Sequence, residues 1–262
     1  GSMSVSALAS ECRAFFLENG GVTATLATTV TTTTTNSIAA SLRSGTFMTL
    51  RDWSITATTT GSFSAIYTEN ISFVGTTTLD GIGTISLQNS QIDDGTVDGT
   101  SSVGLGVDLT DCYLFGTLQV TGSGVGTGVR STRCTVMGNT KISGSLPASS
   151  SSDSAVTLHT ITVDTGATLW VNPDVTEASL AAATRSVLLQ GNNLCVEGSN
   201  CIFRAASPHH NAMRLDSGTM IDGAKLIAIG RPSPQSSETG SYVIWAASPS
   251  GTIRSCEIIC TS

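Results

Sequence analysis

The sequence carries a short repeat that recurs along most of its length. The five clearest copies begin at Ile66, Ile85, Val107, Val129 and Val156. They are 19, 22, 22 and 27 residues apart, and each continues as apolar-x-small-x-polar-x-x-apolar. A unit this short cannot bury its own apolar side, whereas stacked units share a continuous core. The repeat therefore predicts a solenoid rather than a sandwich of hairpins, which would show Asn-Gly or Asp-Gly turns.

Parallel stacking would place equivalent positions of successive coils about 4.8 Å apart. The first apolar residue of each copy then points inward, and a polar ladder forms at a corner: Asn70, Asn89, Asp111, Arg133 and Thr160. Beside that corner, Cys112 and Cys134 fall in one inward column with Ser90 and Ile71. We interpret these cysteines as core residues, while a bridge between them stays open.

The two ends of the chain depart from the repeat. Gly1 to Met3 resemble a cloning scar, and apolar residues such as Val5, Leu8 and Phe16 then follow at helical spacing. We expect a helix over residues 4–21 that caps the first coil. Coils would occupy 22–223, and 224–262 would hold the last irregular coils with a cap or assembly segment.

The repeat resembles a known family of folds. Its pattern, apolar-x-apolar-x-x-Asn/Asp-Cys/Ser-x-apolar-x-Gly, is clearest in residues 65–138 and is similar to the right-handed parallel β-helix superfamily. That superfamily contains pectate-lyase-like enzymes and many phage tailspikes. The resemblance implies an all-β, right-handed parallel β-helix of about eight to ten coils. It also implies a homotrimer in a virion or an extracellular setting.

Composition limits the partners. The chain has a formal net charge of -7, and Lys141 and Lys225 are its only lysines, so we expect no nucleic-acid partner. No apolar run reaches the roughly 18 residues that a membrane span needs. We therefore expect neither a membrane span nor a cofactor.

Cysteine and histidine placement gives little sign of a metal site. The seven cysteines are an odd number, so at least one is unpaired within a monomer, and a bridge between Cys195 and Cys201 stays open. His209 and His210 are adjacent, and on a strand they would point to opposite faces. We expect no bound metal.

Outward positions should form three ladders that alternate with the core. These are Tyr67, Ser86, Asp108, Arg130 and Thr157; Glu69, Gln88, Thr110, Thr132 and His159; and Ser72, Gln91, Tyr113, Thr135 and Thr162. Ligand contacts would then come from Tyr67, Asp111, Tyr113, Arg133 and His159.

Cleavage of a sugar chain would need two carboxylates, one acting as an acid and one as a base or nucleophile. The candidates are Glu69, Asp93, Asp94, Asp108 and Asp111, with Arg130 or Arg133 as a base in a lyase. However, acidic residues at such corners often accept backbone hydrogen bonds instead. The hydrolase signature of the superfamily, Asn-Thr-Asp, Asp-Asp and Gly-His-Gly on successive coils, is represented only by Asp93-Asp94-Gly95.

We therefore expect a structural or receptor-binding module of a virion-associated spike or fibre that contacts surface glycans. The alternative is a polysaccharide lyase or glycoside hydrolase on the same fold. A third hypothesis, an adhesin or ice-type binder, would use threonine ladders. Its support is thin, because threonine runs such as Thr31 to Thr35 lie near the start and show no repeat at the coil period.

Overall fold

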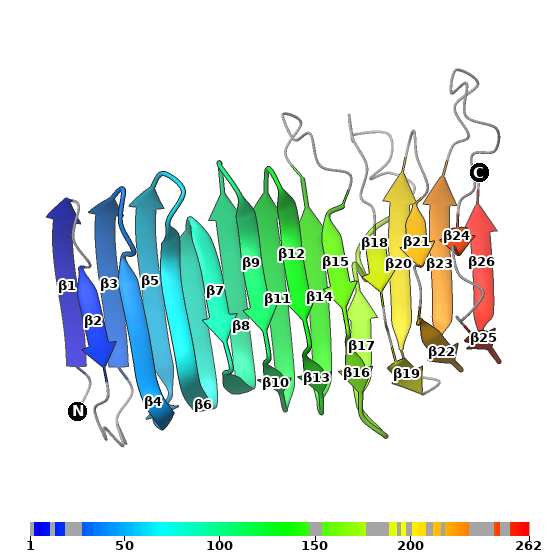
Figure 1. The fold of residues 1–262 in the computed structure, drawn as a ribbon, viewed down its shortest axis with the longest axis horizontal. Coiled ribbons are helices and arrows are strands. Elements are labelled where there is room, and N and C mark those ends of the chain that lie inside the picture. Colours follow the sequence, from blue (N-terminus) through cyan, green and yellow to red (C-terminus); the bar gives the residue numbers. More distant parts are fainter. Residues whose placement is uncertain are drawn as a thin grey trace.

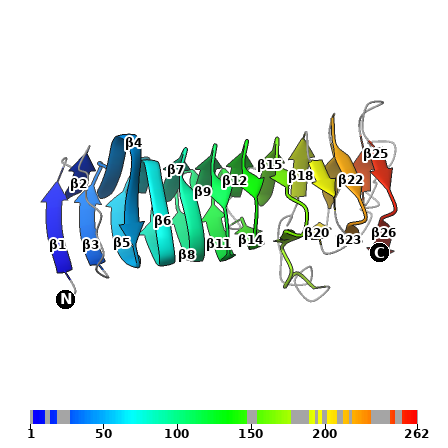
Figure 2. The ribbon, with the colours of Figure 1, turned by 90° about the horizontal axis from the view of Figure 1, so that it is seen from below.

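A computed structural model shows the protein as an elongated stack of parallel strands, with the N-terminus at one end and the C-terminus at the other (Figures 1 and 2). It describes residues 3–10, 14–18, 28–146, 154–176, 189–192, 195–197, 201–207, 212–215, 218–230, 244–246 and 252–261. Every regular element in these residues is a β-strand, and no helix among them is long and apolar enough to cross a membrane.

The strands form three parallel faces. Face A contains β1 (Met3–Ser10), β3 (Thr28–Thr35), β5 (Trp53–Thr60), the last parts of β6 (Ser64–Ile82) and β8 (Gln91–Ser101), β11 (Thr117–Gly124), β14 (Asn139–Ser145), β17 (Thr168–Val171), β20 (Ile202–Ser207), β23 (Lys225–Gly230) and β26 (Glu257–Thr261).

Face B follows face A within each coil. It contains β2 (Phe15–Glu18), the first parts of β4 (Ala40–Arg51) and β6, β7 (Thr84–Gln88), β9 (Leu105–Thr110), β12 (Thr127–Thr132), β15 (Val156–His159), β18 (Leu189–Asn192), β21 (Met213–Leu215) and β24 (Ile244–Ala246).

Face C closes each coil and leads back to face A. It contains the end of β4, the middle of β6, the start of β8, β10 (Tyr113–Leu114), β13 (Thr135–Val136), β16 (Thr162–Val163), β19 (Cys195–Glu197), β22 (Met220–Asp222) and β25 (Thr252–Arg254). The chain is thus an all-β parallel solenoid, with about seven turns in the nearly continuous residues 28–176. Strands on both sides of that stretch continue the same columns.

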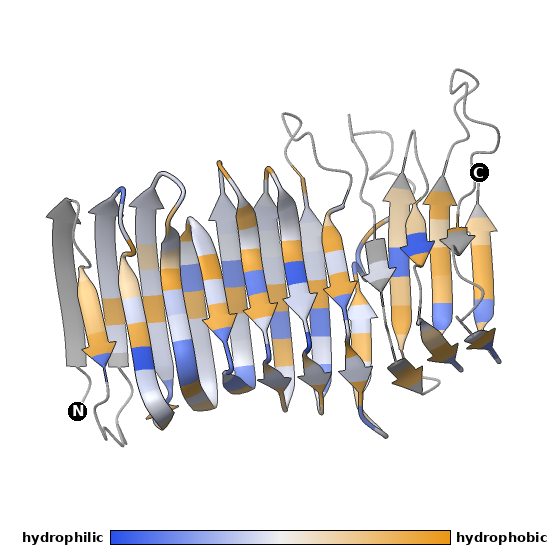
Figure 3. Ribbon diagram, viewed as in Figure 1, coloured by the Kyte–Doolittle hydropathy of each residue, from blue (hydrophilic) through white to orange (hydrophobic). Residues whose placement is uncertain are grey.

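Alternating side chains fill the interior of the coil. The predicted inward column, Ile66, Ile85, Val107, Val129 and Val156, pairs in register on face B, and each member is 0% exposed. Figure 3 shows bands of similar hydropathy that cross neighbouring strands, as this register requires. A slip of one residue would move the apolar side chains of an entire strand from the core to the surface. The burial of these side chains therefore fixes the register.

The predicted N-terminal helix is wrong. Strand β1 lies there instead and pairs with β3 from Met3↔Thr28 to Ser10↔Thr35, and β2 pairs with β4. The residues Val5, Ala7 and Ala9 fit a two-residue period, whereas the helical period that suggested a cap used Val5, Leu8 and Ala9. The threonine-rich edge of β3 offers a row of backbone partners, and pairing along it prevails over the helical pattern.

The predicted corner ladder between faces B and C is confirmed by its backbone. All five members have positive φ: 59° at Asn70, 43° at Asn89, 56° at Asp111, 52° at Arg133 and 57° at Thr160. Asn and Asp tolerate this left-handed conformation best among non-glycine residues, because their short side chains hydrogen-bond locally. The polar position of the repeat is therefore a backbone requirement of the turn.

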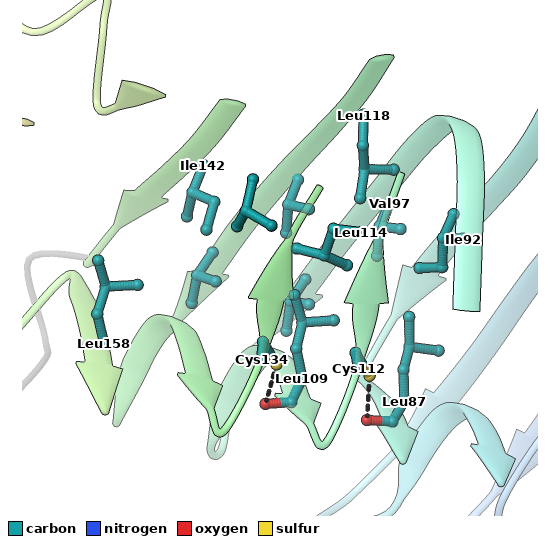
Figure 4. Packing of buried hydrophobic residues seen from close by; sticks show 14 of the residues in the cluster. Leu87, Ile92, Val97, Leu109, Cys112, Leu114, Leu118, Cys134, Ile142 and Leu158 are labelled. Carbon is teal, nitrogen blue, oxygen red and sulfur yellow. Dashed lines mark hydrogen bonds between the residues drawn. The ribbon is translucent and has the colours of Figure 1, made fainter. Parts of the chain in front are cut away.

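The cysteine column beside that corner belongs to the core. Cys112 and Cys134 are 1% exposed free thiols, and they donate to the carbonyls of Leu87 and Leu109 at 3.4 and 3.6 Å (Figure 4). Because both thiols are free, no disulfide joins Cys112 and Cys134. Cys201 is also a free buried thiol, so it forms no bridge with Cys195.

A glycine seam joins faces A and B. A Cβ on Gly122 would lie 2.1 Å from the carbonyl oxygen of Gly128, and one on Gly99 would lie 2.3 Å from that of Gly106. Backbone therefore packs directly on backbone along this edge. No side chain larger than hydrogen fits at these positions without a shift of the backbone.

Candidate functional site

The three outward ladders predicted from the sequence exist in the predicted register. The ladders that contain Asp108 and Glu69 run along face B, and the ladder that contains Tyr113 runs along face C. The candidate residues are therefore exposed or half-buried on two adjacent faces, and their individual contacts decide what they can do.

Glu69 is held by two neighbours. Arg43 donates from Nε to Glu69 Oε2 at 2.9 Å, and the hydroxyl of Tyr67 donates to the same oxygen at 3.2 Å. The guanidinium of Arg43 also lies 5.7 Å from the centroid of the Tyr67 ring. This cluster engages the Glu69 carboxylate in an ion pair with Arg43 and a hydrogen bond with Tyr67.

Asp108 and Asp111 each form a bidentate ion pair with an arginine of the next coil. Arg130 donates to both oxygens of Asp108 at 3.0 and 2.6 Å, and Arg133 donates to both oxygens of Asp111 at 2.6 and 2.7 Å. The hydrogen bond from Arg133 lowers the pKa of Asp111, and the bond to Asp108 raises the pKa of Arg130. A carboxyl with a lowered pKa is a poor general acid, and an arginine with a raised pKa is a poor base.

Asp93 and Asp94 lie elsewhere, at the corner where face C turns into face A. Asp94 Oδ1 accepts the backbone N–H of Thr117 from the next coil at 2.5 Å. Asp52 makes the same kind of contact with the backbone N–H of Thr76 at 3.0 Å. Asp94 therefore joins two neighbouring coils through a side-chain to backbone hydrogen bond.

The candidate acids do not gather around one point. Glu69 and Asp108 are on face B two strand spacings apart, about 10 Å along the axis, while Asp93 and Asp94 are at another corner. Tyr113 is 42% exposed on face C. His159 is on face B and shares a contact of 3.2 Å with Thr160 Oγ1.

Face A carries a column of side chains that lies outside the three predicted ladders. Its members are paired in register: Gln119, Lys141, Trp170, Ile202, Lys225 and Glu257. A hollow of about 490 Å³ opens on this column and on the adjacent corner with face C. Its lining residues are Thr168, Trp170, Ile202, Gly223, Ala224, Lys225, Ser255 and Glu257.

Two charged contacts organise this column. The ammonium of Lys141 lies 5.0 Å from the centroid of the Trp170 ring, and Lys225 Nζ lies 3.1 Å from Glu257 Oε1. Both lysines of the chain are therefore on the column that contains Trp170. A cation–π contact of this kind restrains the indole ring at a surface position.

A second hollow on face A contains two neighbouring carboxylates. Asp80 pairs in register with Asp98, and both line a hollow of about 230 Å³ together with Gln119 and Thr121. Burial raises the pKa of Asp98, and the charge of Asp80 raises it further. The repeated letters "TLDG" at 78–81 and "TVDG" at 96–99 could have revealed this pair.

Face A also carries threonine pairs in register. Thr31, Thr33 and Thr35 pair with Thr56, Thr58 and Thr60 of the next coil. The expectation that the threonine runs show no repeat at the coil period is thus wrong for these two coils, because the repeat was aligned on face B.

Comparisons with protein families, with curated proteins and with solved structures found no match to this chain.

Proposed function

We propose that the chain is a structural, glycan-contacting module of a virion-associated or extracellular spike or fibre, and that it assembles as a homotrimer. The elongated solenoid supports this proposal, because stacked coils give a long body with extended polar faces. We further propose a right-handed coil, the hand that parallel crossover connections adopt in about 98% of cases. It is also the hand of the superfamily that the repeat resembles.

The observation that carries the proposal is the pairing of charges on face B and at its corner with face C. Asp108 with Arg130 and Asp111 with Arg133 form bidentate ion pairs between the same two coils. These groups stabilise the stacking of coils, and the lowered pKa of Asp111 and the raised pKa values of Arg130 and Arg133 are unsuited to acid–base catalysis. Polar groups remain on face A, where hydroxyl, amide and charged side chains line two hollows that could offer hydrogen bonds to a sugar.

A glycoside hydrolase remains the second candidate, and one observation favours it. Asp80 and Asp98 are in register on adjacent strands, about 4.8 Å apart at the backbone. Retaining glycosidases separate their two carboxyl groups by about 5–5.5 Å. The raised pKa of Asp98 would also suit the carboxyl group that acts as the general acid in such an enzyme.

Glycan binding and glycan cleavage can be tested on the same preparation. The purified protein would be applied to a glycan array and incubated with a panel of soluble polysaccharides, while new reducing ends are measured. Binding without new reducing ends supports the structural role. New reducing ends that disappear in Asp98→Asn and Asp80→Asn would establish the hydrolase instead, and failure to bind or cleave any glycan would reject both functions.

Assembly needs a separate measurement. Multi-angle light scattering of the whole chain should give three times the 26.8 kDa mass of one chain. A mass of one or two chains at high protein concentration would contradict the homotrimer.

A further inference from the structure

We propose that the hollow at Trp170 on face A is a sugar-binding subsite that takes a neutral pyranose with two adjacent hydroxyl groups. This inference rests on the proposed glycan-contacting function and adds the place and the chemistry of the contact. The subsite is built by β17, β20, β23 and β26 and by the corner that precedes each of the last two strands.

The size of the hollow suits a bound sugar. Small-molecule sites usually measure about 300–1,000 Å³, and the volume of about 490 Å³ at Trp170 falls within this range. The hollow at Asp80 and Asp98, at about 230 Å³, lies below it. The Trp170 hollow is therefore the better candidate of the two for enclosing a ligand ring.

The lining combines an aromatic surface with a few polar groups. Trp170 provides an amphipathic ring, which is half-buried and restrained by Lys141 from the preceding coil. Ile202, the next residue in the column, extends the apolar area. The apolar C–H surface of a pyranose can pack on this floor without leaving polar groups unpaired.

The Lys225–Glu257 pair gives the subsite its preference for a diol. Lys225 Nζ offers N–H donors, and Glu257 Oε1, 3.1 Å away, offers an acceptor. Two hydroxyls on neighbouring ring carbons can accept from the first group and donate to the second at once. Because the pair itself sums to zero charge, it adds no net attraction for a carboxylated or sulfated sugar.

The same column indicates how a longer chain would lie. Gln119 and Lys141 continue the column beyond Trp170 at about 4.8 Å per coil. An oligosaccharide bound at Trp170 would therefore extend along the axis of the solenoid, where Gln119 offers further hydrogen bonds.

The test is calorimetric titration of the whole protein with six-sugar oligomers of glucose, mannose and N-acetylglucosamine. Hexagalacturonate and a heparin hexasaccharide serve as anionic probes. Trp170→Ala should weaken binding of a neutral oligomer about tenfold or more, and Lys225→Met and Glu257→Ala should each weaken it severalfold. Circular dichroism and thermal unfolding would check that each variant folds.

The chain offers matched controls for these variants. Arg254 and Asp222 form an ion pair of 2.8 Å between β25 and β22, on face C. Arg254→Met and Asp222→Ala should leave sugar binding unchanged, as should Phe63→Ala at an exposed aromatic residue outside the hollow.

Each outcome bears on a different claim. Binding of a neutral oligomer that depends on Trp170 and Glu257 but not on Asp222 supports the subsite. Binding that is unaffected by Trp170→Ala overturns the subsite and leaves the proposed function standing, and binding of the anionic probes alone overturns the preference for a neutral sugar. Absence of binding to every oligomer and to the glycan array removes the proposed function, and the subsite with it.

Discussion

Arg133 donates to both carboxylate oxygens of Asp111, which precedes it by 22 residues and lies one coil away. Arg130 and Asp108 repeat this arrangement with the same offset. Because both pairs join β9 to β12 or the corner that follows, they fix these coils at two points. The two ion pairs form only when these two coils are stacked next to each other in this register. Opposite charges in successive copies of the repeat thus favour the observed order of the coils.

A double-mutant cycle on Asp111→Asn and Arg133→Gln should give only a weak coupling at pH 7, because both side chains are exposed and water screens the pair. The lowered pKa of Asp111 fixes the sign of the pH dependence. Its contribution is present above the ordinary pKa of aspartate and is lost as the pH falls through the lowered value. Urea unfolding at pH 7 and pH 2.5 measures both effects, and a coupling that grows on acidification contradicts the assignment.

The buried thiols allow a second prediction. Cys112→Ser should cost less than about 1.5 kcal/mol of unfolding free energy, because Ser90 fills the same column and donates to the carbonyl of Gln88 at 2.8 Å. Cys112→Asp should cost about 3 kcal/mol or more, since it buries an unpaired charge. Urea denaturation compares the two. Equal losses in the two variants would show that the column is not closely packed.

Addition of a single methyl group at the glycine seam should destabilise the protein. Gly122→Ala places a Cβ 2.1 Å from the carbonyl oxygen of Gly128, so we expect a loss of about 1–3 kcal/mol. Gly126→Ala is the matched control, because the nearest atom to its Cβ is 3.5 Å away. Thermal unfolding should separate the two variants, and similar midpoints would exclude backbone contact at the seam.

Thr160 is a β-branched residue in the left-handed conformation, at a φ of 57°. Thr160→Asn should stabilise the protein by about 1 kcal/mol, because asparagine adopts this conformation more readily. The reciprocal change Asn89→Thr should destabilise it. Thr162→Asn, on the extended strand β16, is the control and should give no gain in thermal stability. A destabilised Thr160→Asn variant would contradict the corner ladder.

The Asp80–Asp98 pair predicts a stability that depends on pH. A carboxyl with a raised folded-state pKa favours folding at acid pH, and this contribution disappears as the pH rises through the folded value. Asp98→Asn should therefore stabilise the protein at pH 7 by about 0.2–1 kcal/mol, and the gain should vanish near pH 3. Denaturation at both values tests this. Asp174→Asn, at an exposed carboxylate outside this hollow, is the control variant.

The register of the solenoid could be predicted because each inward apolar residue is followed by an outward polar one. Ile85 and Val107 show clearly which residues of their strands point inward. A polar residue, Asn89 or Asp111, then follows each strand at the corner. The N-terminal strands were missed because Val5 and its small neighbours satisfy two periods at once.

The Trp170 hollow could not be read from the sequence alone. The step from Trp170 to Ile202 is 32 residues and the step from Ile202 to Lys225 is 23, so their alignment depends on the lengths of the intervening connections. The glycine seam was equally hidden. Gly122 and Gly128 look like ordinary turn residues until the approach of two backbones shows why no side chain fits.

The parallel pairing of β5, β6, β8 and β11 aligns the backbone hydrogen bonds of face A with the long axis of the molecule. Tension applied between the two ends would load the junctions between coils in series, so the most weakly joined pair of coils would separate first. Compression would instead press the filled cores of neighbouring coils together. The molecule is therefore mechanically suited to act as a strut rather than a tether.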